Sequence, residues 1–293
     1  MESFLSGFGS KIAEKWLTVL VLPGLLFAGA TLIAWALPQD HALDLGVLAD
    51  RTTAANAWLD KGGASVVLLA VALTMLWASA AALAARGGGF LVHRMWLRRW
   101  TGPVSRHLVQ RRQDDWTAAD DALADLFADD ETDLPARRNE LAAVRNGIAL
   151  AFPARPTWTA DRARSVDVRI WHAYGLDLAS VWPRLWLVVP EETRAEIRAA
   201  RDSFGQAGDL LGWSLLYLAV TPFWWPSAVV GMATALTGWY RTRASLATYA
   251  DLVEATVDLR ARALAVELAL LPPDDPFTRE TGLRITRLLR KGT

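Results

Sequence analysis

The stretch "LLGWSLLYLAVTPFWWPSAVVGMATALTGWY", residues 210–240, carries no charged side chain. As one helix, these 31 residues would extend about 46 Å, whereas the hydrocarbon core of a bilayer is only about 30 Å thick. Pro222 and Pro226 bracket its centre, and proline disfavours helical geometry in the preceding residue, so the chain can reverse there. We therefore predict a hairpin of two membrane-spanning helices. A re-entrant loop is the alternative, because both arms are short.

The charges that flank this stretch support the hairpin. Arginine and lysine beside short spans prefer the cytoplasmic side of a membrane. The arginines nearest the stretch are Arg194, Arg198 and Arg201 before it, and Arg241 and Arg243 after it. Since both flanks are basic, both are predicted to be cytoplasmic, and the segment must enter the membrane and return.

Two earlier runs, residues 16–39 and 62–85, each hold 24 uncharged residues, enough for a transmembrane helix. Pro23 could kink the first. The motif "AWA" in the first run resembles a signal-peptide cleavage site, but the run exceeds the usual apolar length of about 7–15 residues. Glu2 and Glu14 also cancel the positive charge that precedes it, so an uncleaved anchor is favoured.

These runs predict an all-α polytopic membrane protein with four transmembrane helices and a helical cytoplasmic domain. Both termini are predicted to be cytoplasmic, in the cytoplasmic membrane, and the acidic loop 40–61 is predicted to lie outside. The predicted divisions are 1–92, an amphipathic segment with helices one and two; 93–205, the cytoplasmic helical domain; 206–243, the transmembrane hairpin; and 244–293, a cytoplasmic helix and tail.

Tryptophans stand near the ends of the apolar runs, where indole rings anchor at the headgroup level of a bilayer. The candidate anchors are Trp16, Trp35, Trp224, Trp225 and Trp239. Packing in a core is the alternative for single tryptophans. The glycine cluster "RGGGF", residues 86–90, predicts a hinge where the second span leaves the bilayer.

The segment between spans two and three has helical periodicity and no sustained alternation, so a sheet is not expected. Thr159 is the expected N-cap of one of its helices, and a helix from residue 190 is expected to run unbroken into span three. A basic segment, residues 94–112, precedes an acidic run that contains Asp114, Asp115, Asp120, Asp121 and Asp125. One interpretation is a basic juxtamembrane segment beside anionic headgroups, followed by an acidic helix that faces water. The other is that the acids form a candidate docking face for a basic partner.

Several activities lack a recognisable centre in this chain. It has no cysteine, no His-Glu-x-x-His motif and no phosphate loop, so we expect no metal, cofactor or catalytic residues. The net charge is zero, which gives no support for a nucleic-acid partner. The spans carry no central ionisable group, which argues against ion-coupled transport. Small residues spaced four apart, such as Ala78 with Ala82 and Ala81 with Ala85, favour close packing of membrane helices, within one subunit or between subunits.

The segments "WHAYGLDLASVWPRLWLVVP", residues 171–190, and "ATYADLVEATVDL", residues 247–259, resemble uncharacterised multi-pass membrane proteins of GC-rich Gram-positive bacteria. The resemblance implies no functional residues. The first segment is expected to lie either in the membrane interface or inside the cytoplasmic domain.

We expect a non-enzymatic membrane component that self-associates or binds a cytoplasmic protein partner, as in a signal-gated pore or membrane effector. The alternatives are an anchor or scaffold that recruits a soluble enzyme or sensor, and, with the least support, a membrane enzyme acting on lipid or cell-wall precursors.

Overall fold

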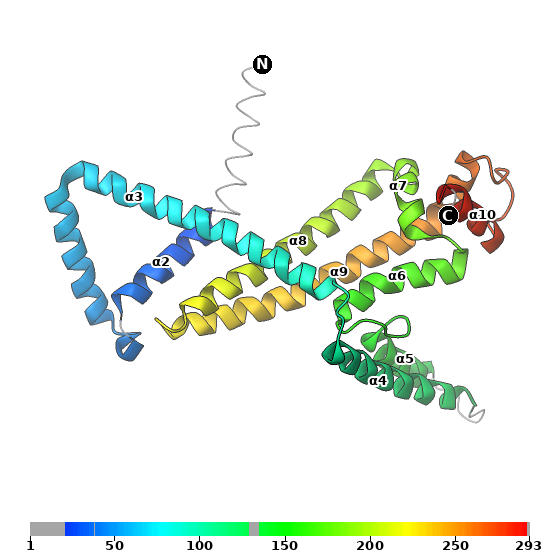
Figure 1. The fold of residues 1–293 in the computed structure, drawn as a ribbon, viewed down its shortest axis with the longest axis horizontal. Coiled ribbons are helices and arrows are strands. Elements are labelled where there is room, and N and C mark those ends of the chain that lie inside the picture. Colours follow the sequence, from blue (N-terminus) through cyan, green and yellow to red (C-terminus); the bar gives the residue numbers. More distant parts are fainter. Residues whose placement is uncertain (1–20, 38, 129–134, 292–293) are drawn as a thin grey trace, which may run out of the picture. The chain divides into compact units, whose positions relative to one another are not determined.

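The computed structural model describes residues 21–37, 39–128 and 135–291, and these contain helices and no strand. The helices are α2 (Leu22–Ala36), the short η2 (Gln39–His41), α3 (Leu45–Leu97), α4 (Pro103–Ala128), α5 (Pro135–Ile148), α6 (Trp158–Tyr174), α7 (Leu178–Val188), α8 (Glu191–Val220), α9 (Pro226–Glu267) and α10 (Arg279–Leu289). Figure 1 shows their order along the chain. The predicted all-α class is confirmed.

The chain forms two compact units. Unit 1 comprises residues 1–93 and 205–242, and unit 2 comprises residues 94–204 and 243–293. The predicted membrane runs belong to unit 1. The two units differ in the kinds of side chain that they bury.

The chain reverses within the "TPFWWP" segment of unit 1. Helix α8 ends at Val220, and α9 begins at Pro226. The turn between them contains Pro222, so both prolines lie where the sequence predicted an interruption of the helix. The amides of Phe223 and Trp224 both donate to the Val220 carbonyl oxygen, at 2.9 and 3.1 Å, and close the turn. Helices α8 and α9, which this turn connects, run side by side. Gly231 of α9 lies against Leu218 of α8, and Gly238 lies against Leu211.

A second segment is hydrogen-bonded to this turn. The Gln39 side-chain amide donates to the carbonyl oxygens of Thr221 and Pro222, at 2.8 and 2.7 Å, and its oxygen accepts from the Trp225 amide at 3.0 Å. The Trp224 indole donates to the Ala42 carbonyl at 2.8 Å. The chain just after α2 and the turn between α8 and α9 therefore lie together in unit 1.

Helix α3 contacts its neighbours in unit 1 through small residues. A Cβ at Gly212 of α8 would lie 1.7 Å from the Ala85 carbonyl oxygen of α3, and a Cβ at Gly89 would lie 2.1 Å from the Gly208 carbonyl oxygen. Such distances require glycine, since only a bare Cα lets two helix backbones meet. Ala85 is fully buried at this contact. The small-residue stripe of α3 thus joins helices within one chain.

Three sequence-based expectations about local structure are wrong. The glycines of residues 86–90 form no hinge: α3 continues through them, and its one non-helical residue is Gly63, with φ of 67° and ψ of −172°. Figure 1 shows the resulting bend between two straight arms of α3. Most of the expected loop 40–61 is helical, because α3 begins at Leu45. The N-cap of α6 is Thr157, whose hydroxyl accepts from the Ala160 amide at 3.2 Å, not Thr159.

Only one helix among the described residues, α3, is long and apolar enough to cross a membrane, so the four predicted spans are not confirmed. Helix α2 is apolar, but its described part has 15 residues. The uncharged parts of α8 and α9 are short, because Asp209 interrupts the first and Arg241 ends the second. Trp16 lies outside the described residues.

In unit 2, helices α6, α7 and α10 enclose an apolar core with the second half of α9. Its most deeply buried members are Ile170, Leu185, Val257, Leu264 and Ile285. The segment of residues 171–190 contributes α7 to this core. Its expected location in the membrane interface stays a prediction. Helix α8 is unbroken from Glu191 to Val220, as predicted.

Replacing Gly212 with alanine should separate α3 from α8, because the new Cβ collides with backbone that cannot yield. We expect the change to lower the stability of the full-length protein by about 1–3 kcal/mol or more, measured as thermal unfolding in detergent. The matched control is Gly205→Ala in the same helix, where nothing lies within 4 Å of the added Cβ. That control should be neutral or stabilising, since alanine is the better helix former. Equal effects of the two changes would contradict the close contact.

Candidate functional site

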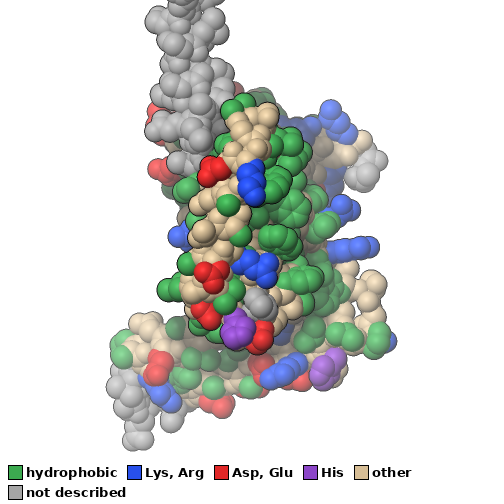
Figure 2. Space-filling view, turned by 90° about the vertical axis from the view of Figure 1, so that its left-hand side faces the viewer, with side chains coloured by type: hydrophobic (Ala, Val, Ile, Leu, Met, Phe, Trp, Pro, Cys, Tyr) green, Lys and Arg blue, Asp and Glu red, His purple; other side chains and the backbone are tan. Residues whose placement is uncertain are grey.

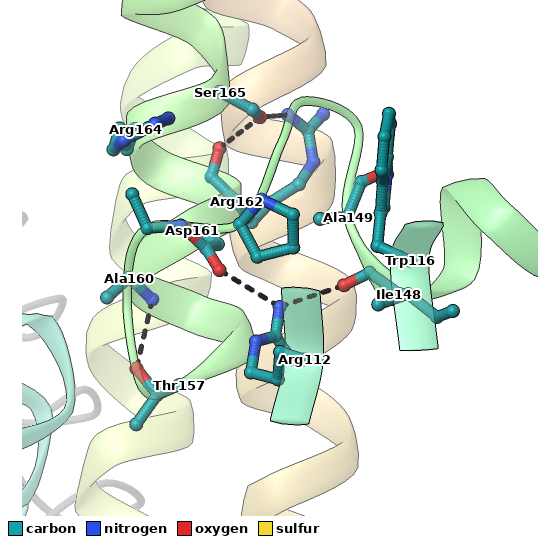
Figure 3. Close-up of polar contacts among 12 residues, drawn as sticks. Arg112, Trp116, Ile148, Ala149, Thr157, Ala160, Asp161, Arg162, Arg164 and Ser165 are labelled. Carbon is teal, nitrogen blue, oxygen red and sulfur yellow. Dashed lines mark hydrogen bonds and ion pairs between the residues drawn. The ribbon is translucent and has the colours of Figure 1, made fainter. Parts of the chain in front are cut away.

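A buried polar network in unit 2 joins α4, α6 and the segment between α5 and α6. Figure 3 shows Arg112 of α4 between Asp161 and the Ile148 carbonyl. Its guanidinium donates to Asp161 Oδ2 at 3.0 Å and to the Ile148 oxygen at 2.9 Å. The other carboxylate oxygen, Asp161 Oδ1, accepts from the Ala154 amide at 3.0 Å. Since only 4% of Asp161 is exposed, the ion pair is shielded from water.

The next residue, Arg162, is equally buried and points away from this pair (Figure 3). It forms a salt bridge with Asp251 of α9 and donates to Ser165 Oγ at 3.2 Å. Two adjacent residues of α6 therefore bind two different helices. A buried charge costs several kcal/mol unless it is paired, so these pairs fix which surfaces of α4 and α9 can meet α6.

This network was not predicted from the sequence. One feature of the sequence could have predicted buried ion pairs here. Asp161 is followed directly by Arg162, which places two opposite charges on neighbouring sides of a helix whose other face is apolar. The partners Arg112 and Asp251 are far away in the sequence, and no spacing rule could identify them. Both arginines are engaged by carboxylates, and the Ser165 hydroxyl binds Arg162, so the network joins helices of unit 2.

A groove in unit 2 of about 290 Å³ lies among α6, α7 and α9. Apolar side chains line it, including Val166, Trp182 and Val253, and Asp167 stands among them. Burial and the neighbouring Asp177 raise the pKa of the Asp167 carboxyl. Nearby on α9, burial also raises the pKa of Glu254, which forms a salt bridge with Arg169 at 2.9 Å.

The five aspartates of the predicted acidic face on α4 do not share one side of the helix; they point in three directions. Asp114, Asp121 and Asp125 are exposed and share one stripe, because seven and eleven residues correspond to about two and three helical turns. Asp120 is bound to Arg145 of α5 at 2.8 Å, and Asp115 is exposed on a different side. The candidate docking face is thereby reduced to the three-residue stripe.

The described candidate anchors differ in their surroundings. Trp35 is 83% exposed, and Trp225 and Trp239 are also exposed, whereas the Trp224 indole binds the Ala42 carbonyl. Trp16 cannot be compared, since it lies outside the described ranges. Among the described residues, no group of three or more histidine, aspartate or glutamate side chains could hold a metal ion.

Comparisons of the chain with family models, with curated proteins and with solved structures found no match.

The buried pair of Arg112 and Asp161 can be tested with a double-mutant cycle. We expect Asp161→Ala to lower the free energy of unfolding by about 3–5 kcal/mol, because it leaves Arg112 without its carboxylate. Adding Arg112→Ala should cost less than the sum of the single changes, with a coupling energy of about 1–3 kcal/mol. The measurement is unfolding of the full chain in detergent, and the exposed Asp121→Ala is the control. Strict additivity would argue against the pair.

Proposed function

We propose that the chain is a non-enzymatic integral membrane protein whose unit 1 is embedded in the bilayer and whose unit 2 is cytoplasmic. One observation carries the proposal: unit 1 leaves many large apolar side chains exposed, while glycines and alanines fill the contact between α3 and α8. Phe27, Leu211 and Trp213 are among the large side chains that unit 1 buries. In α3, Ala85 is fully buried while Leu68, Leu76 and Leu83 are 69%, 67% and 65% exposed.

A core helix of a soluble protein would have the opposite pattern. Of the most apolar window of α3, only 17% is buried within the chain. Leaving so much aliphatic surface in water would cost about 25 cal/mol for each Å². Figure 2 shows many hydrophobic side chains beside the nearest segment, which itself carries acidic and basic side chains. A contiguous apolar surface on this scale indicates contact with lipid or with another protein.

The same pattern extends to the other helices of unit 1, which supports four spans. The large apolar side chains exposed on them are Leu22, Leu26 and Leu32 of α2, Leu215 and Leu218 of α8, and Val229, Val230, Met232 and Leu236 of α9. The Gln39 contacts also agree with the predicted topology, because they join two segments that it assigns to the same, outer side.

Self-association is the second part of the proposal. The alanine stripe of α3 is used within the chain, so an oligomer would associate through the larger apolar side chains that surround it. A strictly monomeric particle in detergent, near the chain mass of 32.1 kDa, would exclude a pore on an oligomer axis.

The topology can be tested by cysteine labelling, because the chain contains no cysteine of its own. With a membrane-impermeant maleimide, we expect the exposed Asn56→Cys to label in intact cells and Asp274→Cys to label only after permeabilisation. The unmodified chain is the control and should not label. The reverse pattern, or recovery of the chain in the soluble fraction after washing membranes at high pH, would contradict the proposal.

Recruitment of a basic cytoplasmic protein is the second candidate function, and the exposed stripe on α4 favours it. We expect that changing Asp114, Asp121 and Asp125 together to lysine abolishes co-purification of such a partner with the full-length protein. A matched triple change of Glu196, Asp274 and Asp275 to lysine alters net charge equally and should preserve capture. If both variants capture the same proteins as the unmodified chain, the stripe is a solvated face.

A further inference from the structure

Arginine and tryptophan side chains gather where α3 leaves its apolar run. Three arginines and two tryptophans lie close together in the sequence here: Arg94, Trp96, Arg98, Arg99 and Trp100. These residues belong to unit 2, and its other parts contribute more of the same kinds. The basic segment of residues 94–112 is the one that the sequence places beside anionic headgroups, and Trp96 and Trp100 are not among the predicted anchors.

Two contacts hold the start of α6, one to Trp96 and one to α9. The Thr157 hydroxyl donates to the Trp96 carbonyl oxygen at 2.7 Å. The next residue, Trp158, lies under the Arg243 guanidinium of α9, with 4.2 Å between the guanidinium carbon and the ring centroid. The same hydroxyl of Thr157 caps α6, so the segment just before that helix is firmly positioned.

Arg155 lies two residues before Thr157, and Arg99 lies three residues after Trp96, so the hydrogen bond between Thr157 and Trp96 holds the two arginine-bearing segments together. The Arg164 guanidinium donates to the Phe152 carbonyl oxygen at 3.4 Å, which joins α6 to the segment that carries Arg155.

The pKa of Arg155 is lowered by burial and by the charges of Arg99 and Arg164, and Asp161 opposes the shift. Asp161 is the one carboxylate that acts on Arg155 there, and its two oxygens already bind Arg112 and the Ala154 amide. In the described part of the chain, neither Arg99 nor Arg155 forms an ion pair with a carboxylate.

Guanidinium groups without carboxylate partners are matched by phosphate oxygens, which accept hydrogen bonds from arginine in the same forked geometry. Basic clusters directly beside a membrane span bind anionic phospholipids, and tryptophan prefers the same headgroup level. Here Arg99 lies 14 residues beyond the end of the 62–85 run of α3, and Arg243 lies three residues beyond Tyr240 in α9.

We propose that Arg99 and Arg155, with Arg164 beside them, form a binding site for the phosphate headgroups of anionic phospholipids in the cytoplasmic leaflet. This inference rests on the proposed membrane location of unit 1. It adds a lipid preference, which membrane insertion alone does not require.

The test uses the purified full-length protein in a neutral detergent, with phosphatidylglycerol or phosphatidylcholine titrated in. Unfolding is followed by tryptophan fluorescence, because a ligand that binds the folded state raises the unfolding temperature. We expect phosphatidylglycerol to raise it saturably, and phosphatidylcholine and inorganic phosphate to have no comparable effect. The double variant Arg99→Gln/Arg155→Gln should need on the order of tenfold more phosphatidylglycerol for half-saturation.

The matched control is Arg284→Gln/Arg287→Gln, which removes two exposed arginines from α10 in the same unit and changes net charge equally. It should titrate like the unmodified protein. Equal effects of the two lipids, equal losses in the two double variants, or saturation by inorganic phosphate alone would each overturn the inference. If cysteine labelling supports the topology while the lipids fail to differ, only this inference fails. A chain that is soluble without detergent would instead remove the proposed function.

Discussion

The close approach of α3 and α8 is the constraint on which unit 1 depends. Gly89 and Gly212 allow the two backbones to meet with no side chain between them, and Ala85 completes the contact. Packing of this kind does not rely on the hydrophobic effect, because the contact buries small residues and leaves leucines outside. It is the arrangement expected of helices whose surroundings are themselves apolar, where close van der Waals contact replaces expulsion of water.

Unit 2 is organised by the opposite principle. Aliphatic side chains such as Ile170 and Val257 are fully buried, and ion pairs at the edge of this core determine which helices meet. Asp161 and Arg162 are adjacent in the sequence and bind α4 and α9 respectively. Buried charges of this kind add little net stability, but an incorrect partner would leave one of them unpaired, at a cost of several kcal/mol. The network therefore favours one arrangement of unit 2 over others.

The two proposals about function follow from this difference. The proposed bilayer location accounts for the exposed apolar side chains of unit 1. The proposed phospholipid site accounts for Arg99 and Arg155, which have no carboxylate partner among the described residues. The acidic stripe of Asp114, Asp121 and Asp125 on α4 needs neither lipid nor anions, since it faces solvent in the described structure.

The sequence by itself determined the helical class, the reversal between Pro222 and Pro226 and the unbroken course of α8. These features follow from local rules: the positions of proline, apolar periodicity and the absence of helix breakers. It did not locate the bend of α3, which falls at Gly63 and not in the glycine cluster of residues 86–90. The glycine cluster predicted a hinge, but Gly89 allows the close contact between α3 and α8.

Only the tertiary structure decided which residues are paired and which are inside. Arg112 and Asp161, or Arg162 and Asp251, are brought together across long stretches of chain, and no periodicity within one helix carries that information. The exposure of large apolar residues in unit 1 is likewise a property of the packed bundle. The sequence pattern of a leucine in an apolar run is the same whether the side chain faces a core or a lipid. The sequence gives the chemistry of the side chain, but the fold determines its surroundings.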